Sequence, residues 1–178
     1  MFILIGGGAR SGKSAFALAR ARRMGARRVF VATAERCDDE MTRRIDLHAK
    51  DRGSDFRTVE APFDIAGAID AIEADVVVVD CLTLWLANLL LRGESEDETL
   101  GRVGALAALL GAKPFHSIVV TNEVGMGIVP ETALGRVFRD LAGRAHQALA
   151  KSADEVYFGA MGLMIRLRPA PVTCEEER

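Results

Sequence analysis

The chain has 178 residues, of which 49% are hydrophobic, and this length and composition fit one compact domain with a full hydrophobic core. Its formal net charge of -2 at pH 7 argues against a general nucleic-acid-binding protein, whose binding surface is normally basic. Cys37, Cys81 and Cys174 form no C-x-x-C pair, so they suggest neither a disulfide framework nor a zinc site and fit a reducing compartment.

No segment of the sequence is expected to enter a membrane. The N-terminal apolar run lacks the preceding basic residues of a secretory signal peptide. The longest apolar stretch, CLTLWLANLLL, is shorter than the roughly 20 residues that a membrane-spanning helix needs. We therefore expect a cytoplasmic protein with no membrane span.

The first predicted elements are a buried strand, Phe2–Ile5, and a helix, Lys13–Met24, joined by the stretch GGARSGKS. The spacing G-x-x-x-x-G-K-S at a strand-to-helix turn is a complete P-loop signature. The backbone N–H groups of such a loop and the positive end of the following helix bind a triphosphate, its lysine reaches the β- and γ-phosphates, and its serine binds Mg²⁺. We predict nucleotide binding by the residues of this loop, namely Gly7, Gly8, Ala9, Arg10, Ser11, Gly12, Lys13 and Ser14.

The rest of the chain alternates short apolar runs with helix-like segments, which is typical of an α/β fold with a mostly parallel sheet flanked by helices. Further strands are predicted at Val29–Ala32, Phe56–Glu60, Val76–Val79, Ile118–Val120, Val156–Phe158 and Leu163–Leu167, the last two paired through a turn at Gly159–Gly162. Further helices are predicted at Asp38–Asp51, Asp64–Ile72, Leu82–Leu91, Leu100–Leu110 and Thr132–Lys151. The acidic segment Gly93–Glu98 is interpreted as an exposed loop. Residues 1–167 are expected to form the single domain and residues 168–178 a frayed tail.

Asp80 closes the strand Val76–Val79. A P-loop enzyme needs a second acidic residue near its magnesium ion, and this residue is normally found at the carboxyl end of a hydrophobic strand. Asp80 is therefore the candidate second metal ligand beside Ser14. Alternatively, Asp80 caps the helix that begins near Cys81, because aspartate is a common N-cap residue. The two roles are compatible.

The three histidines of the chain carry no assignment from spacing alone. His48 lies at the border of the apolar stripe of the predicted helix 38–51, where a partly buried structural histidine is the preferred interpretation. His116 leads into a strand and His146 lies on the last long helix, and both are interpreted as structural.

Several longer stretches resemble those of one enzyme family. They are GGARSGKS, ATAERCDDEM, RIDLHAKDR, VVVVDCLTLWLANLL, and TNEVGMGIVPE followed by GRVFRDLAGRAHQALAKSADEVY. Together they extend from Ile3 to about Leu167 and resemble the bifunctional adenosylcobinamide kinase / adenosylcobinamide-phosphate guanylyltransferase of cobalamin synthesis. The stretch TNEVGMGIVPE is more specific than the P-loop, because no general phosphate-binding rule requires it.

This resemblance implies a RecA-like P-loop fold, a homotrimer and two reactions on one corrinoid. First the hydroxyl of the aminopropanol arm takes the γ-phosphate of ATP or GTP, and then a guanylyl group from GTP joins that phosphate with release of pyrophosphate. The resemblance implies that the second reaction passes through guanylylated His48, since a neutral imidazole can attack phosphorus to give a phosphoramidate. Arg44 and Arg52, one helical turn to either side, either offset phosphate charge or are simply solvated.

The P-loop and the strand-end acid predict a Mg²⁺ cofactor held by Ser14 and Asp80, and the resemblance implies further nucleotide contacts. These contacts map onto Thr33, Ala34, Glu35, Ala49, Lys50, Asp51, Arg52, Glu60 and Asp80. The partners it implies are GTP or ATP, adenosylcobinamide and adenosylcobinamide phosphate, with no nucleic acid. In the segment Asn122–Glu131, the apolar Met126, Ile128 and Val129 are expected to contact a neighbouring subunit, the corrinoid or the core.

Three other functions fit a P-loop. A plain small-molecule kinase requires only that His48 be structural. A GTP-operated switch is disfavoured, because no N-K-x-D motif follows a strand and Asp80-Cys81-Leu82-Thr83 is not the D-x-x-G of a switch segment. An oligomeric ATPase motor shares the fold, but nothing in the sequence suggests a nucleic-acid or polypeptide track.

Overall fold

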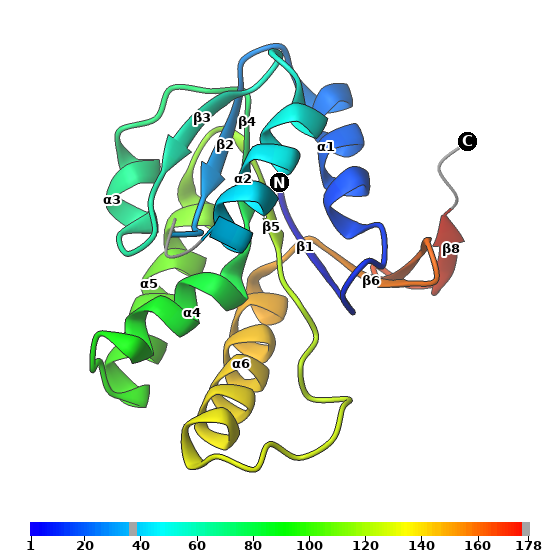
Figure 1. The fold of residues 1–178 in the computed structure, drawn as a ribbon. Coiled ribbons are helices and arrows are strands. Elements are labelled where there is room, and N and C mark those ends of the chain that lie inside the picture. The colour runs from blue at the N-terminus through cyan, green and yellow to red at the C-terminus, as the bar shows by residue number, and fades with distance from the viewer. Residues whose placement is uncertain (36–38, 176–178) are drawn as a thin grey trace.

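The structure is a computed structural model that describes residues 1–35 and 39–175, and its centre is one eight-stranded sheet with helices on both faces (Figure 1). The strands are β1 (Phe2–Gly7), β2 (Arg28–Ala32), β3 (Arg57–Glu60), β4 (Val76–Asp80), β5 (His116–Val120), β6 (Glu155–Ala160), β7 (Leu163–Arg168) and β8 (Thr173–Glu175). The helices are α1 (Lys13–Met24), α2 (Asp39–Arg52), α3 (Ile65–Asp70), α4 (Leu82–Leu91), α5 (Glu96–Ala112) and α6 (Ala133–Ser152). The predicted α/β class and the predicted strands and helices are confirmed, with the two differences given below.

The order of the strands is β3-β2-β4-β5-β1-β6-β7-β8. Strands β1 to β6 pair in parallel, and β7 and β8 complete the sheet in antiparallel pairings. Because β5 lies between β1 and β4, the segment that follows β5 is placed between the P-loop and Asp80 at the carboxyl edge of the sheet. Binding sites of open parallel sheets form at this edge.

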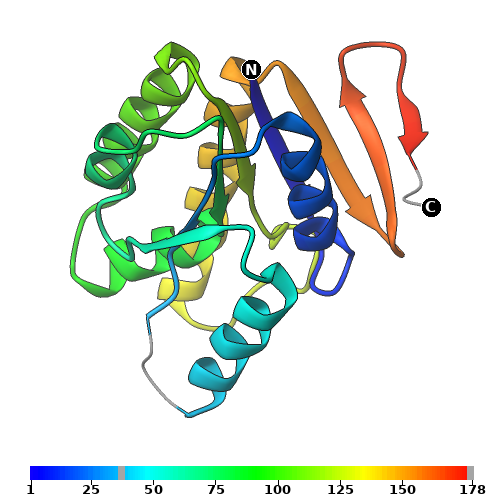
Figure 2. The same ribbon diagram turned by 90° about the horizontal axis from the view of Figure 1, so that it is seen from above.

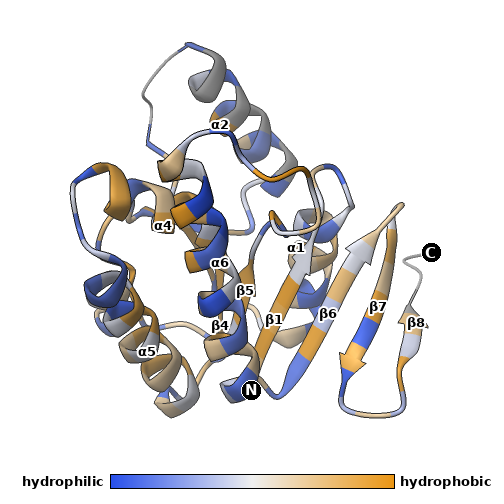
Figure 3. Cartoon of the chain, turned by 90° about the horizontal axis from the view of Figure 1, so that it is seen from below, coloured by the Kyte–Doolittle hydropathy of each residue, from blue (hydrophilic) through white to orange (hydrophobic). Residues whose placement is uncertain are grey.

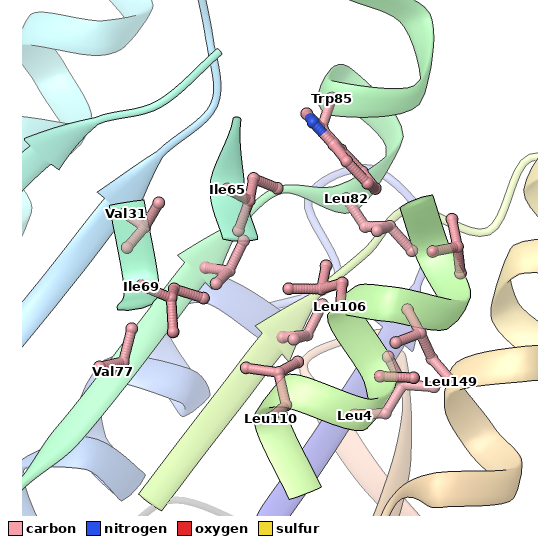
Figure 4. Packing of buried hydrophobic residues seen from close by; sticks show 14 of the residues in the cluster. Leu4, Val31, Ile65, Ile69, Val77, Leu82, Trp85, Leu106, Leu110 and Leu149 are labelled. Atoms are coloured by element: carbon pink, nitrogen blue, oxygen red, sulfur yellow. The ribbon is translucent and has the colours of Figure 1, made fainter. Parts of the chain in front are cut away.

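The core has two halves because successive residues of a strand point to opposite faces of the sheet. Ile3 and Ile5 of β1 pack with α1 on one face, whereas Phe2 and Leu4 pack on the other face with the cluster that includes helices α3 to α6. Figure 4 shows the second cluster, where Trp85 of α4 meets residues of α3 and α5. Figure 3 shows that hydrophobic residues follow the central strands β1 and β5. Each fully buried Leu, Ile or Phe contributes about 1.5–3 kcal/mol to folding.

Helix α2 lies beside α1, on the face opposite α4, α5 and α6 (Figure 2). The contact is made near the C-terminal ends of both helices, where Arg22 Nη2 donates a hydrogen bond of 3.0 Å to the Arg52 carbonyl. At this end of α2, the Arg52 guanidinium lies against the Phe30 ring of β2. The first predicted residue of this helix, Asp38, lies outside the described residues.

Two segments differ from the sequence prediction. Helix α5 begins at Glu96, inside the predicted loop Gly93–Glu98, because Ser95 and Glu98 form a capping box that satisfies the first N–H groups of the helix. Strand β8 lies inside the segment 168–178 predicted to be frayed, and the prediction is wrong for residues 173–175 because the free edge of β7 offers them hydrogen-bond partners. In the described part of the chain, no helix combines the length and apolar character needed to cross a membrane.

Candidate active site

The P-loop joins β1 to α1 in a tight turn that depends on its glycines. Gly7 has a φ of 151°, and a Cβ atom there would lie 2.4 Å from the carbonyl oxygen of Gly159 in β6. Gly12 caps α1 with a φ of 89°, which L-residues rarely adopt. The Lys13 ammonium donates a hydrogen bond of 2.7 Å to the Gly8 carbonyl and so spans the loop. The loop therefore has the shape that its sequence signature predicts.

Ser14 of α1 meets Asp80 of β4. An interaction with the Ser14 side chain lowers the pKa of Asp80, but burial raises that pKa by more. The alternative capping role of Asp80 is wrong, because the N-cap of α4 is Cys81 and no side chain caps that helix. The Asp80 carboxylate is directed toward the P-loop instead.

Three basic side chains act electrostatically on the Asp80 carboxylate: those of His48 and Lys13, followed by Arg52. Each of them lowers the pKa of Asp80, although burial outweighs them. Burial also lowers the pKa values of Lys13 and Arg52, and the charge of Asp80 partly offsets this effect. The carboxylate and these basic groups therefore form one coupled cluster from α1, α2 and β4.

His48 and Arg52 lie one turn apart on α2 but in different surroundings. His48 is exposed, so the interpretation of His48 as a partly buried structural histidine is wrong. Arg52 is only 6% exposed, and its guanidinium lies 4.0 Å from the centre of the Phe30 ring and 3.4 Å from Thr58 Oγ1. Arg52 is therefore not a solvated side chain. The side chains of Arg44 and Asp51 lie outside the described part of the structure, as does Cys37.

Thr33 follows β2 and fastens its end to the end of β4. Its hydroxyl donates to the Cys81 carbonyl and accepts from the Cys81 N–H, both at 2.8 Å. Its own N–H donates to the Asp80 carbonyl at 3.3 Å. The Thr33 side chain is thus fully engaged within the protein and fixes the position of Asp80.

The other predicted nucleotide contacts lie along the same edge of the sheet. Ala32 at the end of β2 is in register with both Glu60 of β3 and Asp80 of β4. Ala34 is half-buried, and the exposed members of the set are Glu35, Ala49, Lys50 and Glu60. The fold therefore brings Glu60 and the residues that follow β2 to the edge of the sheet that carries Asp80, whereas Ala49 and Lys50 lie on α2 beside His48 in the sequence.

One supporting residue, Asn88, was missed by the sequence prediction, whereas Asn122 lies in the segment that the sequence had already singled out. Asn88 of α4 donates hydrogen bonds of 2.8 and 2.9 Å to the carbonyls of Thr33 and Pro62. Asn122, after β5, donates to Thr83 Oγ1 of α4 at 3.0 Å. Asn88 is a polar residue within the apolar helix α4, and this contrast is the signal that could have identified it.

The segment after β5 is tied to the P-loop strand by its backbone. The N–H of Thr121 donates to the Ile5 carbonyl and that of Glu123 to the Gly7 carbonyl, each at 2.9 Å. Met126 and Ile128 in this segment are 80% and 96% exposed, so the core is excluded for them among the three predicted alternatives. Their apolar surface remains available to a substrate or a second subunit.

The Ser14 hydroxyl and Asp80 carboxylate suit a hard cation such as Mg²⁺, which prefers oxygen ligands. Among the described residues, no group of three or more His, Cys, Asp or Glu side chains could hold a metal. The two oxygen ligands Ser14 and Asp80 are nevertheless sufficient for Mg²⁺, because it commonly takes one or two protein ligands together with phosphate oxygens and water. The buried Ser11 hydroxyl in the same loop also has no hydrogen-bond partner in the described structure.

Residues 3–167 match the family described as cobinamide kinase / cobinamide phosphate guanyltransferase. The chain is similar to the bifunctional adenosylcobalamin biosynthesis protein CobP of Pseudomonas aeruginosa, with 42% identity over 95% of this chain and 98% of that protein. It is also similar to the bifunctional adenosylcobalamin biosynthesis protein CobU of Salmonella typhimurium, with 38% identity over 94% of this chain and 100% of that protein.

Solved structures of lower identity share the fold. The RadB recombinase superposes with a TM-score of 0.55 at 16% identity, over 97% of this chain and 85% of that one. An ATPase of a type III secretion system superposes with a TM-score of 0.56 at 14% identity, over 90% of this chain and 51% of that one. These likenesses support the RecA-like P-loop fold.

Proposed function

The chain belongs to the cobinamide kinase / cobinamide phosphate guanyltransferase family, and we propose that it phosphorylates adenosylcobinamide and then joins GMP from GTP to the product. The observation that carries this proposal is the cluster at Asp80, where a P-loop lysine and serine meet a histidine from a separate helix. A plain kinase has no use for an exposed histidine at that position.

In the kinase step, the hydroxyl of the aminopropanol arm attacks the γ-phosphorus of ATP or GTP, and the nucleoside diphosphate leaves. The N–H groups of the P-loop hold the phosphates, and Lys13 exchanges its bond to the Gly8 carbonyl for a phosphate oxygen. Ser14 and Asp80 would hold Mg²⁺, which neutralises phosphate charge when it is bound.

In the transferase step, His48 acts as the nucleophile. Its neutral imidazole attacks the α-phosphorus of GTP, a P–N bond forms and the bond to pyrophosphate breaks. The phosphate of adenosylcobinamide phosphate then attacks the same phosphorus, and the imidazole leaves to give adenosylcobinamide-GDP. Exposure of His48 gives both substrates access, and Arg52 and Lys13 supply positive charge nearby.

The remaining nucleotide contacts in this proposal come from the strand ends and from α2. They are Thr33, which contributes by holding the backbone around it, and the set Ala34, Glu35, Ala49, Lys50, Asp51 and Glu60. The register of Ala32 with both Glu60 and Asp80 supports the assignment at the strand ends.

Labelling tests the histidine directly. Incubation with GTP labelled at the α-phosphate should leave an acid-labile label on the wild-type chain, and His48→Asn should abolish it while leaving some phosphorylation of adenosylcobinamide. His116→Asn is the matched control, because His116 begins β5 at the amino end of the strand, whereas the P-loop and Asp80 lie at the carboxyl ends of theirs. A wild-type protein that phosphorylates adenosylcobinamide but never carries label would reduce the function to that of a plain kinase.

We further propose a cytoplasmic homotrimer. Exposed Met126, Ile128 and Val129 provide apolar surface that a neighbouring subunit would cover. Light scattering after gel filtration should give a mass about three times the 19.2 kDa of the chain. A monomer at micromolar concentration would contradict the trimer without touching the proposed chemistry.

A further inference from the structure

A carboxylate that the proposed function does not yet use lies beside the P-loop. Glu123 follows β5, and its N–H donates to the Gly7 carbonyl at 2.9 Å, so its backbone is fixed against the first glycine of the loop. Its carboxylate oxygen Oε1 accepts a hydrogen bond of 2.5 Å from the Gly125 N–H. The side chain therefore has a defined place rather than a solvated one.

Glu123 lines a cavity of about 360 Å³ that opens next to the triphosphate-binding loop. The other walls come from P-loop residues 8–11, from Met126 and from residues 158–161 at the end of β6. Glu123 is the single acidic residue among the described residues that line it, and Arg10 is the single basic one. A hydroxyl that enters this cavity meets a carboxylate on the side next to the P-loop.

His146 of α6 supports Glu123 from behind. Its Nε2 lies 2.7 Å from Thr121 Oγ1, and its Nδ1 lies 3.7 Å from Glu123 Oε2, which is too far for a hydrogen bond. Burial lowers the pKa of His146, and the charge of Glu123 only partly offsets this effect. The neutral form of the imidazole is therefore favoured, and Oε2 accepts no hydrogen bond from a described residue.

We propose that Glu123 is a catalytic residue of phosphoryl transfer and that the cavity beside it receives the hydroxyl-bearing arm of the acceptor. The acceptor oxygen forms a bond to the γ-phosphorus as the bond to the nucleoside diphosphate breaks. The hydroxyl proton passes to Glu123 Oε2 and then to solvent. His146 is a positioning residue that limits the movement of the carboxylate. This inference rests on the proposed kinase activity.

The test separates the two half-reactions. Glu123→Gln keeps an oxygen for the Gly125 N–H but loses the base, so kcat for phosphorylation of adenosylcobinamide should fall about a hundredfold or more. The KM for ATP should stay within about threefold, because the P-loop is untouched. Labelling of His48 by GTP should persist. Glu123→Asp should recover part of the loss, and Glu131→Gln, an exposed acid of the same segment, should behave as wild type.

A double-mutant cycle tests His146. His146→Gln should lower kcat about tenfold with little change in KM, and adding it to Glu123→Gln should cost nothing further, because both changes act through one carboxylate. Purely additive losses would overturn the positioning role.

A Glu123→Gln enzyme with a kcat near that of wild type would overturn the catalytic role. The role would also be overturned if Glu123→Gln lost ATP binding and His48 labelling together with kinase activity. A wild-type protein that cannot phosphorylate adenosylcobinamide would overturn the proposed function itself, and this inference with it.

Discussion

The Ser14 side chain of α1 lies close enough to the Asp80 carboxylate of β4 to lower its pKa, and this contact couples the first helix of the chain to its fourth strand. The strand order makes this contact possible, because β1 and β4 are separated only by β5. A nucleotide-bound Mg²⁺ would lie between these two side chains. It therefore links the phosphate-binding loop to the residues that act on the phosphates.

The first prediction concerns the loop itself. Lys13→Ala should lower kcat for phosphorylation of adenosylcobinamide by about 10²- to 10³-fold, because the ammonium that stabilises the negative charge of the phosphates in the transition state is lost. Ser14→Ala should cause a loss of similar size with a raised requirement for Mg²⁺. Steady-state rates at saturating nucleotide provide the measurement. Near-normal turnover in both variants would contradict the assignment of the loop.

Asp80→Asn should separate activity from stability. Burial raises the pKa of Asp80 in the folded protein, so folding favours the protonated carboxyl. Ionisation of Asp80 therefore lowers the free energy of unfolding as the pH rises above the pKa that Asp80 has in the unfolded chain. Below that pKa the loss of stability is absent. An amide avoids the cost.

At pH 7 and without nucleotide, Asp80→Asn should thus be at least as stable as wild type in urea, yet nearly inactive. The stability difference should shrink as the pH falls, because the wild-type carboxyl becomes protonated. A variant that is destabilised at pH 7 would show that the Asp80 charge stabilises the fold.

Thr33→Val should destabilise the protein by about 1–3 kcal/mol, because the Cys81 N–H loses its buried partner. Thr33→Ser keeps the hydroxyl and should recover most of the loss. Urea unfolding measures both. The Val variant should also weaken Mg²⁺-dependent activity, since Thr33 holds the chain on either side of Asp80. Equal stability of the Val and Ser variants would show that the Thr33 hydroxyl does not hold the ends of β2 and β4 together.

Arg52→Lys should not be a conservative change. The planar guanidinium stacks on Phe30 and reaches Thr58, whereas an ammonium can reproduce the charge but not the stacking. We expect a stability loss of about 1 kcal/mol and weaker labelling of His48, because α2 is less firmly held over the strands. Arg43→Lys, an exposed position on the same helix, is the control. Unchanged labelling in Arg52→Lys would mean that Arg52 does not position α2.

The sequence by itself determined the parts that depend on neighbours in the chain. The P-loop from Gly7 to Ser14 is a local motif, so its spacing is sufficient to predict its turn and its anion site. Strands such as Val76–Val79 are short apolar runs, and their burial on both faces follows from composition. The family was likewise recognisable from several stretches of sequence, among which TNEVGMGIVPE is more specific than the P-loop.

Only the tertiary structure decided which distant side chains meet. Periodicity placed His48 and Arg52 on one helix, but it could not show that the first is exposed beside Asp80 while the second stacks on Phe30. The capping role of Asp80 was excluded only by the structure, in which Cys81 is the N-cap of α4 and no side chain caps that helix. In the same way, Glu123 and His146 come together only because β5 lies next to β1 and α6 packs against that part of the sheet. Hydrophobic patterns report whether a residue faces the core, whereas the order of strands and the docking of helices decide which polar groups share a site.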